Sequence, residues 1–221
     1  MEIKVIITGA TGMVGEGVMF ECLDNANVKQ VLILNRRPYG MRHPKLKELI
    51  VEDFFNLAQV ENQLIGYDAC FYCAGISSAG MKEADYTRIT YDTTLHVANT
   101  LARLNSSMVF SHISGNHTDG TEKSGIMWAR VKGRTENALM RLPFKNVYNF
   151  RPGLMKPTDG QKNIKGPYKI IRSLYPVVKF IFPKHVLLLK EVGQAMINSV
   201  VKGYGKQVLE IKDIKELATG T

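Results

Sequence analysis

A tryptophan and a lysine lie four residues apart in the sequence IMWARVKGRTENAL. This stretch has a helical pattern, and on a helix such spacing places Trp128 and Lys132 on one face. The lysine offers a cationic hydrogen-bond donor, whereas the tryptophan indole donates through its N–H but does not ionise in the useful pH range. General acid–base catalysis needs a titratable group within hydrogen-bond reach. The pair can therefore bind and polarise a substrate, but Trp128 cannot complete a proton relay.

Two histidines lie near Ser114 in SHISGNHTDG and could supply a titratable group. Histidine has the pKa range suited to catalysis near neutral pH. Because side chains alternate along a strand, His112 is expected on the same face as Ser114. His117 lies in the following loop and is freer to reach a pocket, so we rank it first as a substitute proton carrier. Tyr91 and Tyr168 are further candidates, and a purely structural role is the alternative for both histidines.

Three glycines spaced by three residues follow the first apolar segment in TGATGMVGEG. Such glycines let the chain turn tightly and approach a pyrophosphate, while the N-terminus of the next helix supplies N–H groups to the anion. The triplet lies between a β-prone and a helical segment, which is the context that supports a dinucleotide site. A tight turn without a ligand is the alternative. The predicted cofactor contacts in this loop are Thr8, Gly9, Thr11, Gly12, Met13, Val14 and Gly15.

The end of the second predicted strand favours NADP(H) over NAD(H). NAD is typically bound through an acidic residue that accepts a hydrogen bond from the ribose 2′-OH, whereas cationic side chains suit the 2′-phosphate of NADP. The sequence here is LNRRPY, without an adjacent acid. The guanidinium groups of Arg36 and Arg37 match the geometry of a phosphate. Two solvated surface arginines are the alternative interpretation.

Seven β-prone segments alternate with helical ones along the chain. The predicted strands cover residues 3–7, 30–35, 47–54, 68–75, 107–114, 146–153 and 205–211. The predicted helices follow the glycine loop to about Leu23 and cover residues 57–65, 83–104, 126–141 and 191–202. This alternation predicts an α/β fold with a Rossmann-type, doubly wound parallel sheet of about seven strands. We expect a single domain over residues 1–221, with a small C-terminal substrate or lid insertion at about 154–190.

The order of these motifs resembles the extended or atypical short-chain dehydrogenases/reductases, which include nucleoside-diphosphate-sugar epimerases and NAD(P)H-binding reductase-like proteins. The resemblance covers roughly residues 1–155, and its elements are TGATGMVG, Asp53, YCAG, Ser114, Lys132 and RPG. It implies contacts with the adenine, with the middle of the cofactor and with the nicotinamide. These are, in turn, Asp53 and Phe54; Cys73, Ala74 and Gly75; and Pro152, Gly153 and Leu154.

This family has a tyrosine four residues before its lysine, where the present sequence has Trp128. In the family the tyrosine transfers a proton, the lysine lowers the tyrosine pKa and holds the nicotinamide ribose, and a serine or threonine orients the substrate oxygen. The resemblance gives the last two roles to Lys132 and Ser114, and Trp128 would shape the pocket. Removal of a general acid typically lowers the rate by about 10²- to 10⁴-fold.

Two functions are therefore open. The first is an NADP(H)-dependent oxidoreductase or epimerase-like enzyme that acts on a small carbonyl or hydroxyl compound. The second is a non-catalytic NADP(H)-binding redox sensor or regulatory protein. The two differ in whether the nicotinamide end of the site is open to a substrate.

The net charge of +9 is concentrated in residues 141–190, which hold eleven Lys or Arg residues and one acid, Asp159. Cations interleaved with apolar groups suit a lid over an anionic small molecule. A solvated rim on a lid helix is the alternative, and we do not favour peripheral membrane contact through residues 166–190. No nucleic-acid-binding motif accompanies the charge, so we expect no nucleic-acid partner.

The three cysteines provide no disulfide framework, which favours a reducing, cytoplasmic setting. Cys70 and Cys73 are expected on opposite faces of a strand, as core residues rather than a redox or metal pair, and we predict no metal site. The N-terminus has no signal-peptide pattern, and no apolar run approaches the ~18 residues of a spanning helix. The family often pairs through the two helices beside the fifth strand, which implies a homodimer.

Overall fold

The computed structural model describes residues 1–164, 175 and 185–220. Its centre is a seven-stranded sheet in the order β3-β2-β1-β4-β5-β6-β9, and every neighbouring pair of strands is parallel. The strands are β1 (Ile3–Thr8), β2 (Val28–Asn35), β3 (Leu46–Ile50), β4 (Ala69–Tyr72), β5 (Val109–Ile113), β6 (Asn146–Phe150) and β9 (Val208–Leu209). The predicted Rossmann-type parallel sheet is confirmed.

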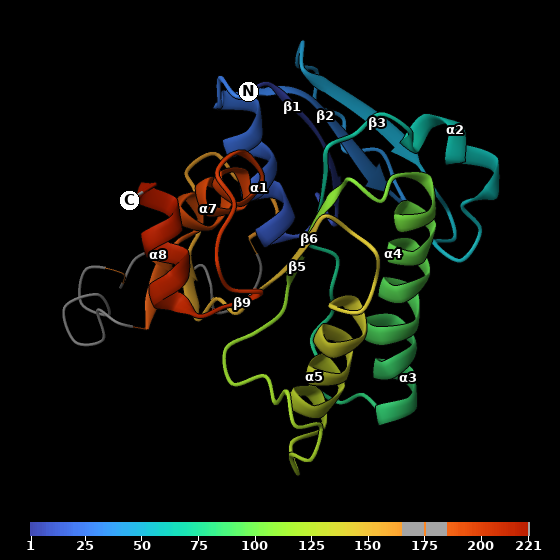
Figure 1. The fold of residues 1–221 in the computed structure, drawn as a ribbon, viewed down its shortest axis with the longest axis vertical. Helices are drawn as coiled ribbons and strands as arrows, with labels where there is room; N and C mark the ends of the chain where they lie inside the picture. The colour runs from blue at the N-terminus through green and yellow to red at the C-terminus, as the bar shows by residue number, and fades with distance from the viewer. Residues whose placement is uncertain (165–174, 176–184, 221) are drawn as a thin grey trace.

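Helices cover both faces of the sheet (Figure 1). One face carries α1 (Met13–Asp24), α7 (Leu189–Val201) and α8 (Ile211–Thr219), and the other carries α3 (Glu83–Thr87), α4 (Thr93–Leu104) and α5 (Met127–Leu139). Each face has its own apolar core, because successive strand residues point to opposite sides. Cys70 belongs to the core under α4, whereas Cys73 packs against the core under α1. The predicted placement of these two cysteines on opposite faces is confirmed.

Several predicted elements differ in detail. The helix expected at 57–65 is a 3₁₀ turn, η1 (Ala58–Val60), followed by the short helix α2 (Glu61–Leu64). The long helix expected at 83–104 contains a π turn, η2 (Arg88–Asp92), between α3 and α4. Two threonine hydroxyls donate hydrogen bonds to backbone carbonyls of this wider turn. Thr93 Oγ1 donates to the Arg88 carbonyl at 2.9 Å, and Thr94 Oγ1 donates to the Thr90 carbonyl at 2.7 Å.

Three elements are not predicted from the sequence. Helix α8 follows the last strand, and its residues Ile211, Ile214 and Leu217 are buried at helical spacing. Strands β7 (Leu154–Lys156) and β8 (Val186–Leu188) form a small parallel pair. This pair joins the two ends of the predicted insertion, most of which lies outside the described residues together with Tyr168. No helix within the described ranges is long and apolar enough to cross a membrane.

Candidate functional site

The strand order reverses between β1 and β4, and ligands of open α/β sheets bind at such a reversal, beyond the carboxyl ends of the strands. The chain is tightly packed there. Gly9 has a φ of +73°, and a methyl group on it would lie 2.7 Å from the Ala74 backbone nitrogen. The Ala74 N–H donates to Thr8 Oγ1 at 3.3 Å, which ties the end of β1 to the end of β4. Only glycine allows this turn and this close approach.

The outer part of the glycine loop is exposed at its turn. The Gly12 N–H donates to the Gly9 carbonyl at 2.9 Å, and a methyl group on Gly15 would lie 2.2 Å from that same oxygen. Thr11 and Gly12 are exposed, and Met13 and Val14 begin α1. A methyl group on Gly75, across the reversal, would meet nothing within 4 Å. The exposed glycine backbone at the N-terminus of α1 would suit a pyrophosphate, because a helix N-terminus supplies N–H groups to an anion.

The predicted arginine pair lies in the loop after β2, and hydrogen bonds hold both ends of this loop to β3. Asn35 Nδ2 and the Tyr39 backbone N–H both donate to Glu48 Oε1 on β3, at 2.9 and 2.7 Å. Between them, Arg36 and Arg37 are exposed, and neither forms an ion pair with another described residue. Two guanidinium groups are thus available to an anion next to the glycine loop.

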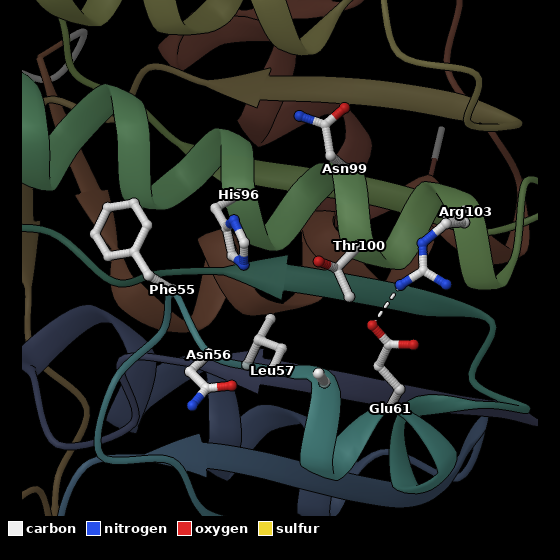
Figure 2. Close-up of a pocket in the computed structure, with 9 residues that line it drawn as sticks. Phe55, Asn56, Leu57, Glu61, His96, Asn99, Thr100 and Arg103 are labelled. Atoms are coloured by element: carbon white, nitrogen blue, oxygen red, sulfur yellow. Dashed lines mark hydrogen bonds and ion pairs between the residues drawn. The ribbon is translucent and has the colours of Figure 1, made fainter.

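The residues implied beside the adenine lie after β3. Asp53 is exposed, and its Oδ1 accepts a hydrogen bond from the Phe55 N–H at 2.9 Å, while Phe54 packs against the core under α4. Next to them is an open groove of about 560 Å³ between α4 and the segment that contains η1 and α2 (Figure 2). Phe55 and His96 form one end of the groove with ring centroids 5.5 Å apart, and the Arg103–Glu61 ion pair lies at the other end (Figure 2). None of the predicted site residues lines this groove.

Ser114, Trp128 and Lys132 are brought together beside the loop that follows β5. A methyl group on Gly115 would lie 3.8 Å from Trp128 Cζ3 and 3.8 Å from Lys132 Cδ. Ser114 Oγ lies 3.1 Å from the hydroxyl of Thr118, which itself donates to the Gly115 carbonyl at 2.7 Å. The Ser114 hydroxyl therefore donates to Thr118, which fixes its orientation. Thr118 is not predicted from the sequence, because no local pattern separates it from the other threonines.

The loop between β5 and α5 is held against this helix. A methyl group on Gly133 would lie 1.7 Å from the Asp119 carbonyl oxygen, and the Asp119 N–H donates to the Ala129 carbonyl at 3.1 Å. Hydrogen bonds from the Thr121 side chain and backbone lower the pKa of the Asp119 carboxyl to about 2. This carboxylate stays charged at neutral pH and keeps the loop folded around it.

The two histidines have different environments. His112 is 2% exposed, and its Nδ1 lies 3.1 Å from Asn149 Oδ1. Burial, and then the charge of Lys132, lower the His112 pKa to about 3, so this ring is neutral at physiological pH. His117 is exposed with a φ of +65°, and its Nε2 lies 3.3 Å from Asn116 Nδ2. The side chain that contacts Ser114 is Thr118, whereas the His117 ring contacts Asn116. The role of His117 as a proton carrier therefore stays a prediction.

Tyr91, a further candidate for the proton carrier, lies in η2 beside α5. The Arg134 guanidinium carbon is 4.0 Å from the centroid of its ring, a cation–π contact between η2 and α5. The structure thus gives Tyr91 a packing partner on α5.

Lys132 is partly buried. The carboxylate of Glu136, one helical turn further along α5, forms an ion pair with Arg151. The Glu136 side chain is 1% exposed and receives two hydrogen bonds from Arg151, from Nε at 3.0 Å and from Nη2 at 2.5 Å. Arg151 Nη1 also donates to Glu210 Oε1 at 3.0 Å. This network fixes α5 to the end of β6. Burial lowers the Lys132 pKa from 10.5 to about 8, and the Glu136 charge opposes part of this shift.

Substitution of Lys132 by methionine should stabilise the protein near neutral pH. Because the Lys132 pKa is lower in the folded chain, the folded chain binds fewer protons than the unfolded chain between about pH 8 and 10.5. The charged lysine therefore lowers the stability of the folded protein, and this effect reaches its full size below about pH 8. After allowance for partial exposure, the expected gain is on the order of 2 kcal/mol at about pH 7 and shrinks as the pH rises. Urea unfolding at several pH values measures it, with the exposed Lys47→Met as control. A gain independent of pH would contradict this interpretation.

Comparison with known proteins places the chain among its relatives. The model of the NAD dependent epimerase/dehydratase family matches residues 5–127, a stretch that ends just before Trp128. The mitochondrial protein fmp52 of Emericella nidulans is 26% identical over 179 residues, which cover 78% of this chain and 74% of that protein.

Solved structures with the same fold include an NAD+ complex and a UDP-N-acetylglucosamine 4-epimerase. The Bordetella bronchiseptica enzyme WbmF in complex with NAD+ is 14% identical with a TM-score of 0.66, and the match covers 99% of this chain and 77% of that one. A UDP-N-acetylglucosamine 4-epimerase from Methanobrevibacter ruminantium is 16% identical with a TM-score of 0.68, covering 95% and 76%. At such identities the likeness shows the shared fold. The family model matches more than half of the sequence, which shows that the chain belongs to the NAD-dependent epimerase/dehydratase family.

Proposed function

We propose that this protein binds NADP(H) along the carboxyl edge of its sheet and acts as an oxidoreductase or epimerase-like enzyme on a small carbonyl or hydroxyl compound. The observation that carries the proposal is the exposed glycine loop at the reversal of strand order, next to two arginines without ion-pair partners among the described residues. A bound nicotinamide dinucleotide would supply the hydride or accept it.

Each part of the edge has a proposed binding role. The glycine loop from Thr8 to Gly15 would bind the pyrophosphate through backbone N–H groups. Asp53 and Phe54 would lie beside the adenine, and the open backbone at Gly75 would let Cys73 and Ala74 line the middle of the cofactor. Gly153 is closely packed, since a methyl group on it would lie 2.6 Å from the His185 carbonyl oxygen. In the nicotinamide role proposed for residues 152–154, the exposed Leu154 side chain is therefore the better contact.

The chemistry proposed for the other end uses three side chains. Lys132 would hold the nicotinamide ribose, and Ser114 would orient the substrate oxygen. It would accept a hydrogen bond from a substrate hydroxyl or, after its own hydroxyl turns away from Thr118, donate to a carbonyl. Trp128 would shape the pocket and could polarise a carbonyl through its indole N–H. Solved relatives that contain NAD together with UDP or UDP-glucose support a nucleotide-linked substrate, which would also suit the basic C-terminal segment.

The second candidate function is a non-catalytic NADP(H) sensor, and Trp128 is the observation that favours it. A residue without a transferable proton, placed beside Lys132, fits cofactor binding without turnover. The two functions share the binding site and differ only in chemistry. We further propose a cytoplasmic protein, because its three cysteines are free, and a homodimer through α4 and α5 on the family resemblance.

Replacement of Arg36 and Arg37 by serine should weaken NADPH binding by at least about 100-fold, because each charged hydrogen bond to the 2′-phosphate contributes about 1.5–3 kcal/mol. NADH binding should change by less than about threefold on the same grounds. Isothermal titration calorimetry with both cofactors measures the ratio. Arg42→Ser, an exposed arginine in the same segment, is the matched control. An equal loss for both cofactors, or no loss, would refute the NADP(H) preference.

A further inference from the structure

Glu16, in the first turn of α1, is 0% exposed and is surrounded by hydrogen-bond donors from distant segments. Its Oε1 accepts from Tyr39 Oη at 2.7 Å, from the Lys162 N–H at 3.0 Å and from Asn163 Nδ2 at 3.1 Å. Its Oε2 accepts from the Asn163 N–H at 2.8 Å and from Gln161 Nε2 at 3.4 Å. A buried carboxylate is stable only with such partners, and its position near a helix N-terminus also favours the negative charge.

One side of this network is the arginine loop. Tyr39 ends that loop, and its backbone N–H is bound to Glu48 while its hydroxyl is bound to Glu16. The orientation of Arg36 and Arg37 therefore depends on two carboxylates, one on β3 and one on α1. Removal of the Glu16 bond would leave the loop attached only through Glu48 among these contacts.

The other side of the network is the segment that follows β7. Gln161 Nε2 donates to the Met13 carbonyl at 2.6 Å, and Gln161 Oε1 accepts from the Thr158 N–H at 2.7 Å. Residues 158–163 therefore rest on the first turn of α1, directly next to the glycine loop. The same residues lie in the first part of the predicted substrate insertion, which covers about 154–190.

We propose that Glu16 is a positioning residue that couples the arginine loop to residues 158–163. A phosphate bound at Arg36 and Arg37 would then also order the start of the substrate-side segment. The physical reason is that Tyr39, Lys162 and Asn163 share one acceptor atom, Glu16 Oε1, so a displacement of Tyr39 changes the bonds to the other two. This inference rests on the proposed NADP(H) binding.

Amide hydrogen exchange of Lys162 and Asn163 tests the coupling. The probes are 2′,5′-ADP, which carries the 2′-phosphate, and 5′-AMP, which lacks it. In the native protein 2′,5′-ADP should slow both amides about tenfold more than 5′-AMP does. Tyr39→Phe should abolish this difference. Tyr67→Phe is the matched control, because Tyr67 Oη accepts a single hydrogen bond from Gln30 Nε2 at 2.6 Å, outside this network.

An undiminished effect of 2′,5′-ADP in a folded Tyr39→Phe variant would overturn the coupling. A native protein that binds 2′,5′-ADP no more tightly than 5′-AMP would instead refute the proposed cofactor preference. The coupling is then decided without ligand: Tyr39→Phe should speed exchange of the two amides by at least about threefold, and unchanged rates would overturn it. Glu16→Gln replaces one acceptor oxygen by a donor and should speed the same exchange further, with circular dichroism as the check on folding.

Discussion

Replacement of Trp128 by tyrosine should raise the rate of NADPH-dependent carbonyl reduction by about 10²- to 10⁴-fold. The other groups needed for the step lie at one place, since Trp128 and Lys132 both reach Gly115, and the Ser114 hydroxyl is held by Thr118. Below its pKa of about 8 the lysine is charged, and a nearby cation lowers the pKa of a tyrosine hydroxyl. Absorbance of NADPH, with aldehydes, ketones and UDP-sugars as substrates near pH 7, measures the rate.

Trp128→Phe is the matched control, because it changes the ring without adding a titratable group. It should be as inactive as the native protein. Equal, fast turnover by the native, phenylalanine and tyrosine forms would contradict the prediction and show that another residue transfers the proton; His117→Ala would then test the first-ranked substitute. A tyrosine variant that binds NADPH but stays inactive would favour the sensor function.

The parts of the fold that depend on local pattern could be predicted from the sequence. The glycine loop is an example, because Gly9 and Gly15 follow an apolar strand at the spacing that a tight strand–helix turn requires, and the structure shows why a side chain would clash at each. The strand alternation that separates Cys70 from Cys73 is equally local.

Side-chain alternation and helical periodicity predict less at the points where a strand ends or a helix changes its turn. Alternation predicts a shared face for His112 and Ser114 but does not give their partners, because β5 ends at Ile113. His112 is buried against Asn149, whereas Ser114 lies in the loop and contacts Thr118. The helix pattern at 83–104 likewise did not reveal the π turn, since the hydroxyl–carbonyl bonds of Thr93 and Thr94 become apparent only in three dimensions.

The buried carboxylates could not be assigned from the sequence at all. Glu16 and Asn163 are 147 residues apart in the chain, and no periodicity relates them. The one available signal is an acidic residue between two glycines in the first turn of the helix, close to buried Val18 and Met19. Such a residue implies buried partners without naming them, because long-range hydrogen bonds depend on the packing of whole elements.

Arg151→Met should lower the free energy of unfolding by about 3–5 kcal/mol, the second large effect that we expect. Arg151 neutralises Glu136, whose side chain is 1% exposed, and joins α5 to β6 and to Glu210. Removal of one partner of a buried pair leaves an uncompensated charge. Urea unfolding measures the change. The control is Lys29→Met, because the Lys29–Glu2 pair is 61% and 64% exposed and should contribute less than about 1 kcal/mol.

A double variant separates the buried charge from lost packing. If the charge dominates, Glu136→Leu in the Arg151→Met background should recover most of the loss, since replacement of a buried pair by apolar groups is often close to neutral. Similar losses for Arg151→Met and Lys29→Met would contradict this and show that water reaches Glu136. Because Glu136 lies one turn beyond Lys132, recovered stability with weakened NADPH binding would show that the pair positions Lys132 as well as stabilising α5.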